Sequence, residues 1–492
     1  VGNIHITENL LGVGSSGTLV YYGYTSELGV LRPVAIKQML RSNYSHAIKE
    51  IANLKKIDAH DNVVNYYMCE QNENFVFLAL QLCRMNLKDF VARLERCLPL
   101  GVLRLRFSPA HSDGVRAALL QAAEAIEYLH RKGVLHRDIK PHNILMEELQ
   151  GTPLTNSGCS MFAGGDIEIY DIADVARFKL RVSDFGLSKN VKTEDMSFGS
   201  QTLEGGRSTH SVVYPEDDRQ PDNTSAAIGQ DKQPSKPPGS ARHWDAVGTI
   251  GWQAPELIKR RLLKRVGHVC DVEDKGTPGD QSRLTSKVDV FALGCVYHFT
   301  LVPGSHPFGH WREREDNIIN NVSDLSLLAR TPDAYDLVHG MIRSDPKLRP
   351  TARQVCFHPF FWNSQKRLEF WEALYCRLKK ESGKSRLMRE LEVYADPVVS
   401  TGWGATLDVA FQREIDNPPH GIIYEVTSIY SCLRFIRHKK SHFDELDGRL
   451  KNLLSLPQGY MRYFESQLPR LFLYTVWFAA THLPGDKEFQ RF

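Results

Sequence analysis

Two short runs of the chain carry residue types that suit phosphoryl transfer. The run that contains Asp138 reads His-Arg-Asp-Ile-Lys-Pro-His-Asn, and the run that contains Asp184 reads Ser-Asp-Phe-Gly. Asp138 is predicted to orient an acceptor hydroxyl and take its proton, and Lys140 to contact the transferred phosphate. Asn143 and Asp184 supply oxygen atoms of the kind that magnesium prefers. The pattern therefore predicts ATP or ADP with Mg²⁺ as the bound nucleotide.

A glycine-rich segment near the N-terminal end is the first candidate to hold that nucleotide. Gly12, Gly14 and Gly17 follow the spacing GxGxxG, which lets backbone N–H groups close over phosphate oxygens. Leu19 stands two residues after the last glycine, where this pattern usually has valine. A plain tight turn is the alternative for this motif taken alone.

Residues farther along the chain favour a nucleotide-binding loop over a plain tight turn at this motif. Lys37 ends the run Val-Ala-Ile-Lys, which matches the strand lysine that contacts nucleotide phosphates. A buried lysine needs an anion, and Glu50 in the following helical pattern is the predicted partner. Gln81 and Cys83 end an apolar strand-like run where a hinge between two lobes should lie. Their backbone could pair with an adenine edge, although a plain core strand stays open as the alternative.

The order of these motifs, closed by Ala-Pro-Glu at 254–256, matches the protein-kinase pattern. A lysine at position 140 is typical of a Ser/Thr kinase. Asp289 and Arg349 occupy the places of lobe-stabilising residues in that pattern, and Arg349 is predicted to pair with Glu256. The open alternative is a kinase fold whose main output is not phosphorylation of other proteins.

The elements that must position these groups indicate an α+β bilobal kinase fold followed by a compact all-α domain. We expect the N-lobe at 1–82, the C-lobe at 83–362 and the helical domain at 363–492. Residues 10–37 are predicted to form a strand, a turn and two strands. The segment at about 203–243 is rich in Gly, Pro, Ser and Asp and is predicted to be disordered. Its hydroxyls are candidate phosphorylation sites, with an inert insertion as the alternative.

Helical spacing of apolar residues recurs after residue 362 and predicts helices rather than strands. The spaced residues are Leu368, Trp371, Leu374, Tyr375 and Leu378, and later Val426, Ile429, Leu433 and Ile436. Only residues 363–367 separate the kinase part from the first of these positions. So short a connection predicts that the two parts move as one body.

A basic segment in this helical part is a candidate phosphodiester site. Its cations and imidazoles are Arg434, Arg437, His438, Lys439, Lys440 and His442. On a helix the two histidines are i,i+4 neighbours on one face. Imidazole moves protons near neutral pH, and arginine or lysine stabilises charge on a phosphate. A solvated basic helix is the alternative, and half of a metal site is discounted because no third ligand converges.

Composition excludes several broad classes of protein. The chain has 492 residues, of which 42% are hydrophobic and 24% charged, as in ordinary globular proteins. The net charge of +3 does not by itself indicate a nucleic-acid binder. Nine cysteines show no CxxC spacing. The chain begins at Val1 rather than Met, so we expect a piece of a longer protein with any signal or membrane anchor upstream.

From about residue 10 to its end, the chain resembles the cytosolic half of the inositol-requiring kinase/endoribonuclease family, the unfolded-protein sensors of the endoplasmic reticulum. The kinase motifs above, the run Gly-Thr-Ile-Gly-Trp-Gln at 248–253 and the segment at 433–446 carry the likeness. The resemblance implies a metal-independent endoribonuclease in which a ribose 2′-hydroxyl attacks the adjacent phosphate. Tyr424 would be the base-side residue, His442 the general acid and Arg437 the group that stabilises the phosphorane.

The chain departs from this family at one position of the implied nuclease site. His438 stands directly after Arg437, where the family usually has asparagine. A second imidazole one turn from His442 makes protonation of both rings harder. We therefore expect a lower pH optimum of cleavage than in a His438→Asn variant.

The resemblance also implies partners and a cellular place. These are RNA, as mRNA stem-loops, a homodimer or higher homo-oligomer, and the cytosolic face of the endoplasmic reticulum membrane through an upstream segment. Autophosphorylation in trans would favour the dimer, and signalling would proceed by mRNA splicing or decay. Ribonuclease L is a more distant relative. A Ser/Thr kinase whose helical domain only recruits a partner is the alternative, and a scaffold without turnover is a third.

Overall fold

The computed structural model describes most of both parts of the chain. The described residues are 2–14, 18–27, 29–41, 44–57, 60–97, 113–149, 172–190, 249–265, 285–393, 395–399, 402–417, 421–446 and 448–492. The segment at about 203–243, predicted to be disordered, lies outside these ranges.

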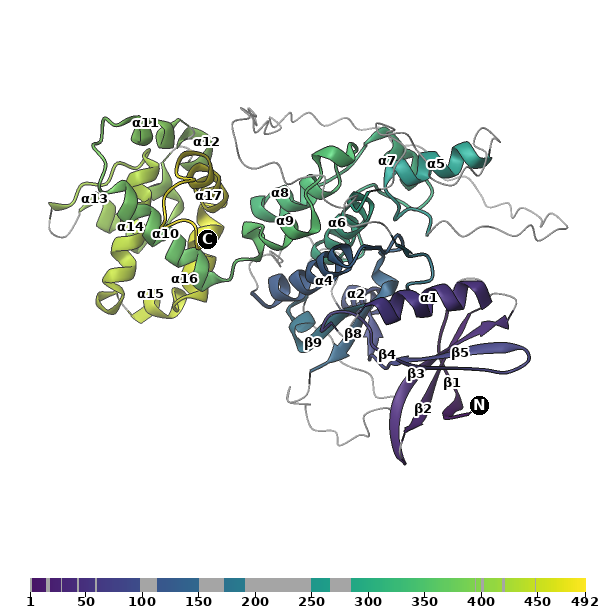
Figure 1. Ribbon diagram of the computed structural model, residues 1–492. Helices are drawn as coiled ribbons and strands as arrows, with labels where there is room; N and C mark the ends of the chain where they lie inside the picture. Colours follow the sequence, from purple (N-terminus) through teal and green to yellow (C-terminus); the bar gives the residue numbers. More distant parts are fainter. Residues whose placement is uncertain are drawn as a thin grey trace, which may run out of the picture.

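The N-terminal part forms a five-stranded antiparallel sheet in the order β1-β2-β3-β5-β4 (Figure 1). Its strands are β1 (Ile4–Val13), β2 (Leu19–Glu27), β3 (Val30–Leu40), β4 (Tyr66–Gln71) and β5 (Phe75–Gln81). Val34 and Ile36 of β3 are buried, as the two-residue period of a strand allows. Helix α1 (Tyr44–Lys56) packs against β3 and β4. The strands predicted for residues 10–37 are confirmed, and the central strand carries Lys37.

The second lobe is mainly helical and holds the most extensive hydrophobic core among the described residues. Its helices are α2 (Leu87–Cys97), α4 (Asp113–Arg131), α5 (Pro255–Arg265), α6 (Lys287–Leu301), α7 (Arg314–Asn320), α8 (Pro332–Met341) and α9 (Ala352–Cys356). Helix α6 is apolar on nearly all sides and buried along most of its length. It packs against α4 and α8, as a helix that is apolar all round requires.

Short strands in this lobe hold the ends of the segments with candidate chemistry. They are β6 (Met85–Asn86), β7 (Val134–Leu135), β8 (Ile144–Glu148), β9 (Phe178–Val182) and β10 (Lys189–Asn190). β7 ends directly before residues 136–143, and β8 begins directly after them. β8 pairs with β9, whose end lies two residues before Asp184. The two sheets therefore bring Asp138 and Asp184 to the same region.

The described residues from 363 to the end form helices and no strand. These helices are α10 (Ser364–Leu378), α11 (Arg386–Glu392), α12 (Ala395–Val399), α13 (Val409–Asp416), α14 (Ile429–Ser441), α15 (Gly448–Leu453), α16 (Gln458–Gln467) and α17 (Leu471–His482). The predicted all-α character is confirmed for this part. The expected helical position of Val426 is wrong, because Ser428 caps α14 by accepting the Ser431 N–H at 3.1 Å.

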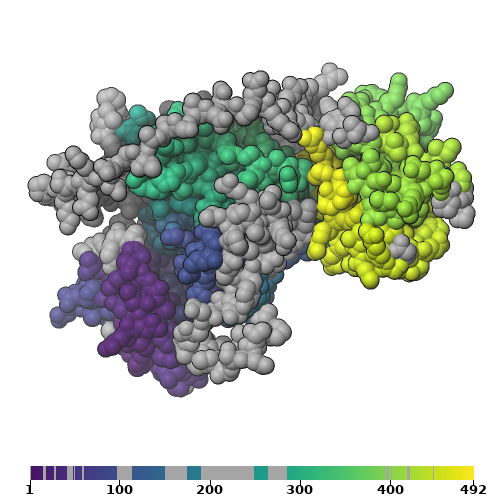
Figure 2. Space-filling model, turned by 180° about the vertical axis from the view of Figure 1, so that it is seen from behind, coloured from purple at the N-terminus to yellow at the C-terminus, as the bar shows by residue number. Residues whose placement is uncertain are grey.

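The three parts follow one another in space as they do in sequence. The helical C-terminal part lies beside the larger lobe, at the end far from the five-stranded sheet (Figures 1 and 2). Trp362, the last residue expected in the kinase part, packs its ring among Phe370, Phe472 and Phe492 of the C-terminal core. The domain boundary at 362/363 stays a prediction, and the aromatic contacts join the two parts at that point.

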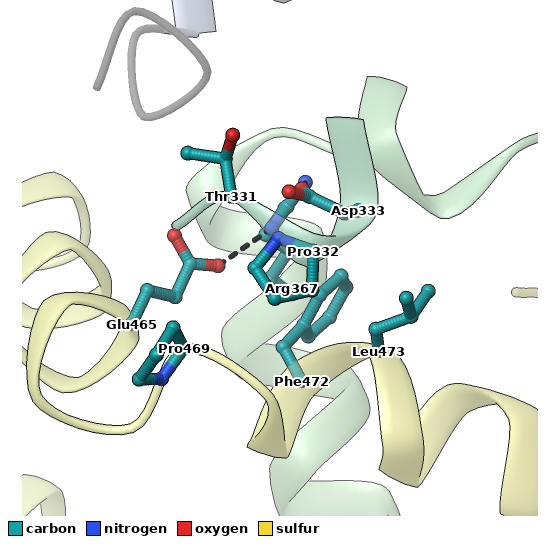
Figure 3. A pocket seen from close by; sticks show the side chains of 8 residues that line it. All are labelled: Thr331, Pro332, Asp333, Arg367, Glu465, Pro469, Phe472 and Leu473. Carbon is teal, nitrogen blue, oxygen red and sulfur yellow. Dashed lines mark hydrogen bonds and ion pairs between the residues drawn. The ribbon is translucent and has the colours of Figure 1, made fainter. Parts of the chain in front are cut away.

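A buried ion-pair cluster lies at the junction of the two parts (Figure 3). Arg367 on α10 is 1% exposed and donates to Glu465 on α16 at 2.7 Å and to Asp333 on α8 at 2.6 Å. It also donates to the backbone carbonyls of Trp362 and Pro359. Burial alone would lower the pKa of Arg367, but the two carboxylates raise it. One guanidinium therefore binds the kinase part to the helical part.

A second contact of the same junction involves the first turn of α10. Asp113 on α4 accepts the Ser364 N–H at 3.1 Å and the Ser364 hydroxyl at 3.1 Å. The same carboxylate pairs with Arg116 at 3.1 Å. Since α10 begins one residue after Asn363, the connection between the parts has little freedom, in line with the short linker.

Candidate active sites

Lys37 forms an ion-paired centre with two carboxylates from other elements. Its Nζ lies 2.9 Å from both carboxylate oxygens of Glu50 on α1 and 2.9 Å from Oδ1 of Asp184. The predicted pair of Lys37 and Glu50 is therefore present. Asp184 joins it from the other lobe, 147 residues away in sequence.

These three groups shift one another's pKa values and so determine which of them are ionised. Burial alone would lower the pKa of Lys37, but Asp184 and Glu50 raise it above its ordinary value. The Lys37 charge lowers the pKa of Asp184 to about 2. Burial raises the pKa of Glu50. At neutral pH the centre therefore presents a fixed cation beside an ionised aspartate.

Asp138 is held by donors on each of its carboxylate oxygens. Lys140 Nζ lies 2.8 Å from Oδ2, and Asn143 Nδ2 lies 3.0 Å from the same oxygen. Thr249 donates to Oδ1 from its backbone N–H at 3.0 Å and from its hydroxyl at 2.9 Å. These bonds fix the carboxylate and keep it an acceptor, as a group that orients a hydroxyl must be.

Thr249 is a site residue that the catalytic motifs alone do not single out. Its hydroxyl also bonds to Lys140, so it links the two groups with candidate chemistry. The available signal was a hydroxyl residue in the run Gly-Thr-Ile-Gly-Trp, shortly before Ala-Pro-Glu. Spacing alone does not reveal that contact, because 111 residues separate Thr249 from Asp138.

The backbone of the catalytic loop is held in an unusual conformation. Arg137 has φ 70°, in the left-handed region that costs energy for a residue other than glycine. Asp289 on α6 accepts the N–H of Arg137 at 2.7 Å and the N–H of His136 at 2.9 Å. The buried carboxylate therefore compensates for the strain next to Asp138. The predicted pair of Arg349 and Glu256 is also present, as a two-pronged contact at 2.7 and 2.8 Å.

The glycine-rich turn is described in part. The Gly14 N–H donates to the Thr18 carbonyl at 2.7 Å and closes the turn between β1 and β2. A side chain added at Gly12 would meet nothing within 4 Å, so this position is open on its outer side. Leu19 opens β2 opposite Val13. Gly17 lies outside the described residues.

The predicted hinge follows β5. The Gln81 N–H donates to the Asn65 carbonyl at 2.9 Å, and Gln81 pairs with Val34 of β3. The contact of its backbone with an adenine edge stays a prediction. The Gln81 side chain donates to Glu147 at 2.8 Å. Burial, with Glu147, raises the pKa of the Cys83 thiol to about 12, so this cysteine is not a thiolate at neutral pH.

The arrangement fits a nucleotide with magnesium. Asn143 Nδ2 donates to the Asp138 carbonyl at 2.8 Å, so its amide oxygen is the atom that can face a cation. The ionised Asp184 carboxylate supplies a second hard oxygen ligand. Lys37 lies within reach of Asp184 and can meet a phosphate there. The donor set therefore agrees with the predicted ATP or ADP and Mg²⁺.

A second cluster of titratable groups lies in the C-terminal part. The Tyr424 hydroxyl is 2.7 Å from His438 Nδ1 on α14. The rings of His438 and His442 meet edge to face with centroids 4.7 Å apart. His442 caps the C-terminal end of α14, and its Nδ1 lies 2.8 Å from Oε1 of Glu445. Tyr424, His438 and His442 thus form a line of titratable groups, joined by one hydrogen bond and one ring contact.

The cations around this cluster differ in their availability. Lys439 pairs with Glu414, and Lys440 pairs with Glu372 at 2.5 Å. Arg434 lies over the Tyr424 ring, at 6.0 Å from its centroid. The expected uniform basic patch is therefore partly neutralised, because two of its lysines pair with glutamates from α10 and α13.

Arg437 is the cation of the segment with the best access to a phosphate. Its side chain is exposed on α14, and its guanidinium carbon lies 6.0 Å from the centroid of Tyr375. Its charge, with that of Arg434, helps to lower the pKa of His438, after burial and His442. Arg437 is therefore close enough to act on the charge of this site.

Two family models cover nearly the whole chain. The protein kinase domain model matches residues 6–208 and 229–361, and the ribonuclease 2-5A model matches residues 367–492. The helical part that holds Tyr424 and the two histidines is therefore similar to a ribonuclease domain.

Relatives with both parts occur in distant organisms. The chain is 29% identical to the serine/threonine-protein kinase/endoribonuclease IRE1b of Arabidopsis thaliana, over 97% of this chain and 46% of that protein. It is 30% identical to the serine/threonine-protein kinase/endoribonuclease IRE2 of Homo sapiens, over 96% of this chain and 41% of that protein. It is 27% identical to the sensor for unfolded proteins in the ER ire1 of Schizosaccharomyces pombe, over 100% and 39%. The chain thus spans less than half the length of each.

Proposed function

The chain belongs to the protein kinase family, and from that premise we propose that it is a bifunctional enzyme, a Ser/Thr protein kinase and a metal-independent endoribonuclease. The observation that carries the proposal is the presence of two separate, assembled sites. One joins Lys37, Glu50 and Asp184, with Asp138 nearby, and the other joins Tyr424, His438 and His442.

In the kinase site the residues of this chain would bind the nucleotide and orient the acceptor hydroxyl. Lys37 and the glycine turn would hold the nucleotide phosphates, Asn143 and Asp184 would hold magnesium, and Asp138 would accept the proton of the attacking hydroxyl. Bound ATP would supply the phosphoryl group. The hydroxyls of the activation segment, at about 203–243, are the proposed acceptors in trans. Lys140 is placed beside Asp138 to contact the phosphate in transfer.

Replacing Asp138 tests the kinase half of the proposal. An Asp138→Asn variant is expected to lose autophosphorylation by about 10²- to 10⁴-fold, because an amide cannot take the hydroxyl proton. Incorporation of labelled phosphate into the purified protein measures the loss, and RNA cleavage with added ADP serves as the folding control. Autophosphorylation at the parental rate would show that Asp138 has no such role.

In the nuclease site the substrate is RNA, presented as stem-loops. The 2′-hydroxyl attacks the adjacent phosphate, Tyr424 lies on the base side, and His442 protonates the leaving 5′-oxygen. Arg437, exposed on α14, stabilises the negative charge of the phosphorane. The product is a 2′,3′-cyclic phosphate, and the reaction needs no metal ion.

We propose that cleavage requires a homodimer or a higher homo-oligomer. Autophosphorylation and nucleotide binding would favour that assembly, which couples the two sites through a shift of population. The cleavage rate per chain is then expected to rise with protein concentration. Initial rates across a dilution series, with the assembly followed by analytical ultracentrifugation, measure this dependence. A rate per chain that stays constant while the assembly dissociates would contradict it.

One relative is named as a sensor for unfolded proteins in the ER, which supports a proposed place at the endoplasmic reticulum. The cytosolic face of its membrane, and signalling by mRNA splicing or decay, are proposed from the family resemblance. No helix among the described residues is both long and apolar enough to cross a bilayer. Attachment to that membrane through an upstream segment is part of the same proposal and rests on the family resemblance.

The alternative is a Ser/Thr kinase whose helical part only recruits a partner. It predicts no RNA cleavage at any protein concentration. The line of Tyr424, His438 and His442 favours the nuclease, because a docking surface has no need of imidazoles in contact.

A further inference from the structure

The line of groups in the nuclease site contains one more proton carrier than the proposed reaction uses. Cleavage by 2′-hydroxyl attack needs one group that accepts a proton and one that donates a proton. His442 is placed to donate. Tyr424 and His438, in direct hydrogen-bond contact at 2.7 Å, compete for the role of acceptor.

Tyr424 is poorly suited to accept that proton. Its side chain is 9% exposed, and burial raises the pKa of its phenol above the ordinary value. The phenol therefore keeps its proton throughout the neutral range. It is enclosed by the rings of Trp403 and Phe435, with only its hydroxyl end directed at His438.

His438 is better placed, because it lies between Tyr424 and the exposed ring of His442. Burial, His442, Arg434 and Arg437 lower the pKa of His438 below its ordinary value, and Glu445 opposes them. The imidazole is therefore neutral near pH 7 and can take a proton. The titratable and charged groups that face it are Tyr424, Arg434, Arg437, His442 and Glu445.

Resting on the function proposed above, we propose that His438 is the general base of RNA cleavage and that Tyr424 is its positioning residue. In the tautomer with the proton on Nδ1, His438 donates to the Tyr424 hydroxyl oxygen. Nε2 then carries the lone pair that faces the substrate. This reassigns the base from Tyr424 to a residue that departs from the family pattern.

The proton balance of this step is complete. The 2′-hydroxyl loses its proton to Nε2 of His438, the 2′-oxygen bonds to phosphorus, and the bond from phosphorus to the 5′-oxygen breaks. The 5′-oxygen takes a proton from Nε2 of His442, whose Nδ1 is held by Glu445 at 2.8 Å. His438 leaves the step protonated and His442 neutral, and both return to their starting states by exchange with water.

A substrate whose leaving group needs no acid separates the two roles. In an RNA with a single 5′-phosphorothiolate linkage, the sulfur departs without protonation, so only the base limits cleavage. His442→Ala is then expected to cleave this linkage within about threefold of the parent. His438→Asn, which keeps a hydrogen-bonding group beside Tyr424, is expected to lose about tenfold or more on both the oxygen and the sulfur linkage.

The pH profile on the sulfur linkage identifies the base. If His438 accepts the proton, the parental rate rises from acid pH and levels off below pH about 6.5, the ordinary histidine pKa. If Tyr424 accepts it, the rate continues to rise toward pH about 10. His438→Asn is expected to remove the levelling, and Tyr424→Phe to lower the rate less than His438→Asn does.

The controls distinguish a wrong assignment of His438 from a wrong assignment of the nuclease activity. His482→Asn makes the same exchange on an exposed histidine of α17 and is expected to leave both rates unchanged. Autophosphorylation reports the folding of every variant. If the parent cleaves RNA and His438→Asn cleaves both linkages at the parental rate, His438 is not the base. The proposed nuclease activity is unaffected by that result. If His438→Asn cleaves the sulfur linkage at the parental rate, His438 acts as the proton donor to the leaving group and not as the base. A parent that cleaves no RNA would overturn the nuclease itself.

Discussion

A His442→Ala variant is expected to cleave RNA about 10²- to 10⁴-fold more slowly than the parent and still to phosphorylate itself. The 5′-oxygen then leaves without a proton donor, while the kinase site is unchanged. Lys37→Ala is expected to abolish autophosphorylation, because it removes the cation between Glu50 and Asp184. RNA cleavage by Lys37→Ala is measured with preassembled oligomer, so that only chemistry is compared.

A matched variant makes this comparison sharp. His482→Ala truncates another exposed imidazole of the same part and is expected to cleave at the parental rate. Gel-resolved cleavage of a fluorescent stem-loop and labelled-phosphate incorporation are read from the same preparations. Equal cleavage by His442→Ala and the parent would mean that the proposed acid is wrong. Loss of both activities in a His442→Ala protein that melts at the parental temperature would contradict the independence of the sites.

Arg367→Ala has the largest expected effect on stability. It removes the guanidinium that pairs with Asp333 and Glu465, and Arg116, 3.6 Å from Glu465, remains as a buried cation beside them. Breaking a buried pair from one side costs about 3–5 kcal/mol. The melting temperature is therefore expected to fall by about 10 °C, as measured by calorimetry on the whole chain.

Arg377 on the same helix supplies the control for that prediction. It pairs with Glu381 at 2.6 Å and with Asp486 at 2.9 Å, but its side chain is 24% exposed. Arg377→Ala is expected to cost less than about 1 kcal/mol, as partly exposed pairs do. A double variant with Arg367→Met and Asp333→Asn leaves Glu465 beside Arg116, at 3.6 Å, and should recover part of the loss. An Arg367→Ala variant as stable as Arg377→Ala would contradict the proposed role of the cluster.

Much of the kinase part could be predicted from the sequence, because its chemistry depends on short motifs with fixed spacing. The pair of Lys37 with Glu50 and the pair of Arg349 with Glu256 follow from residue types within such motifs. The helices after residue 362 follow from the spacing of their apolar residues. The role of Thr249 could not be predicted, because its bond to Asp138 forms only when two distant segments fold together.

In the helical C-terminal part, several contacts could not be predicted from residue spacing. Lys439 and Lys440 read as a free positive patch, but Glu414 and Glu372 from other helices pair with them. The contact of Tyr424 with His438 joins a loop to a helix and has no signature in spacing. The Arg367 cluster likewise gathers residues from helices more than 30 positions apart. Side-chain contacts between elements require the packed structure.

The most direct test of the central claim is to identify the ends of RNA cut by the purified parent protein. A short stem-loop is incubated with protein above its assembly concentration, with ADP, and with or without a chelator. The proposal predicts cleavage that persists in the chelator and a 5′ fragment ending in a 2′,3′-cyclic phosphate, found by mass spectrometry. Fragments ending in a free 3′-hydroxyl, or intact RNA at every protein concentration, would contradict it.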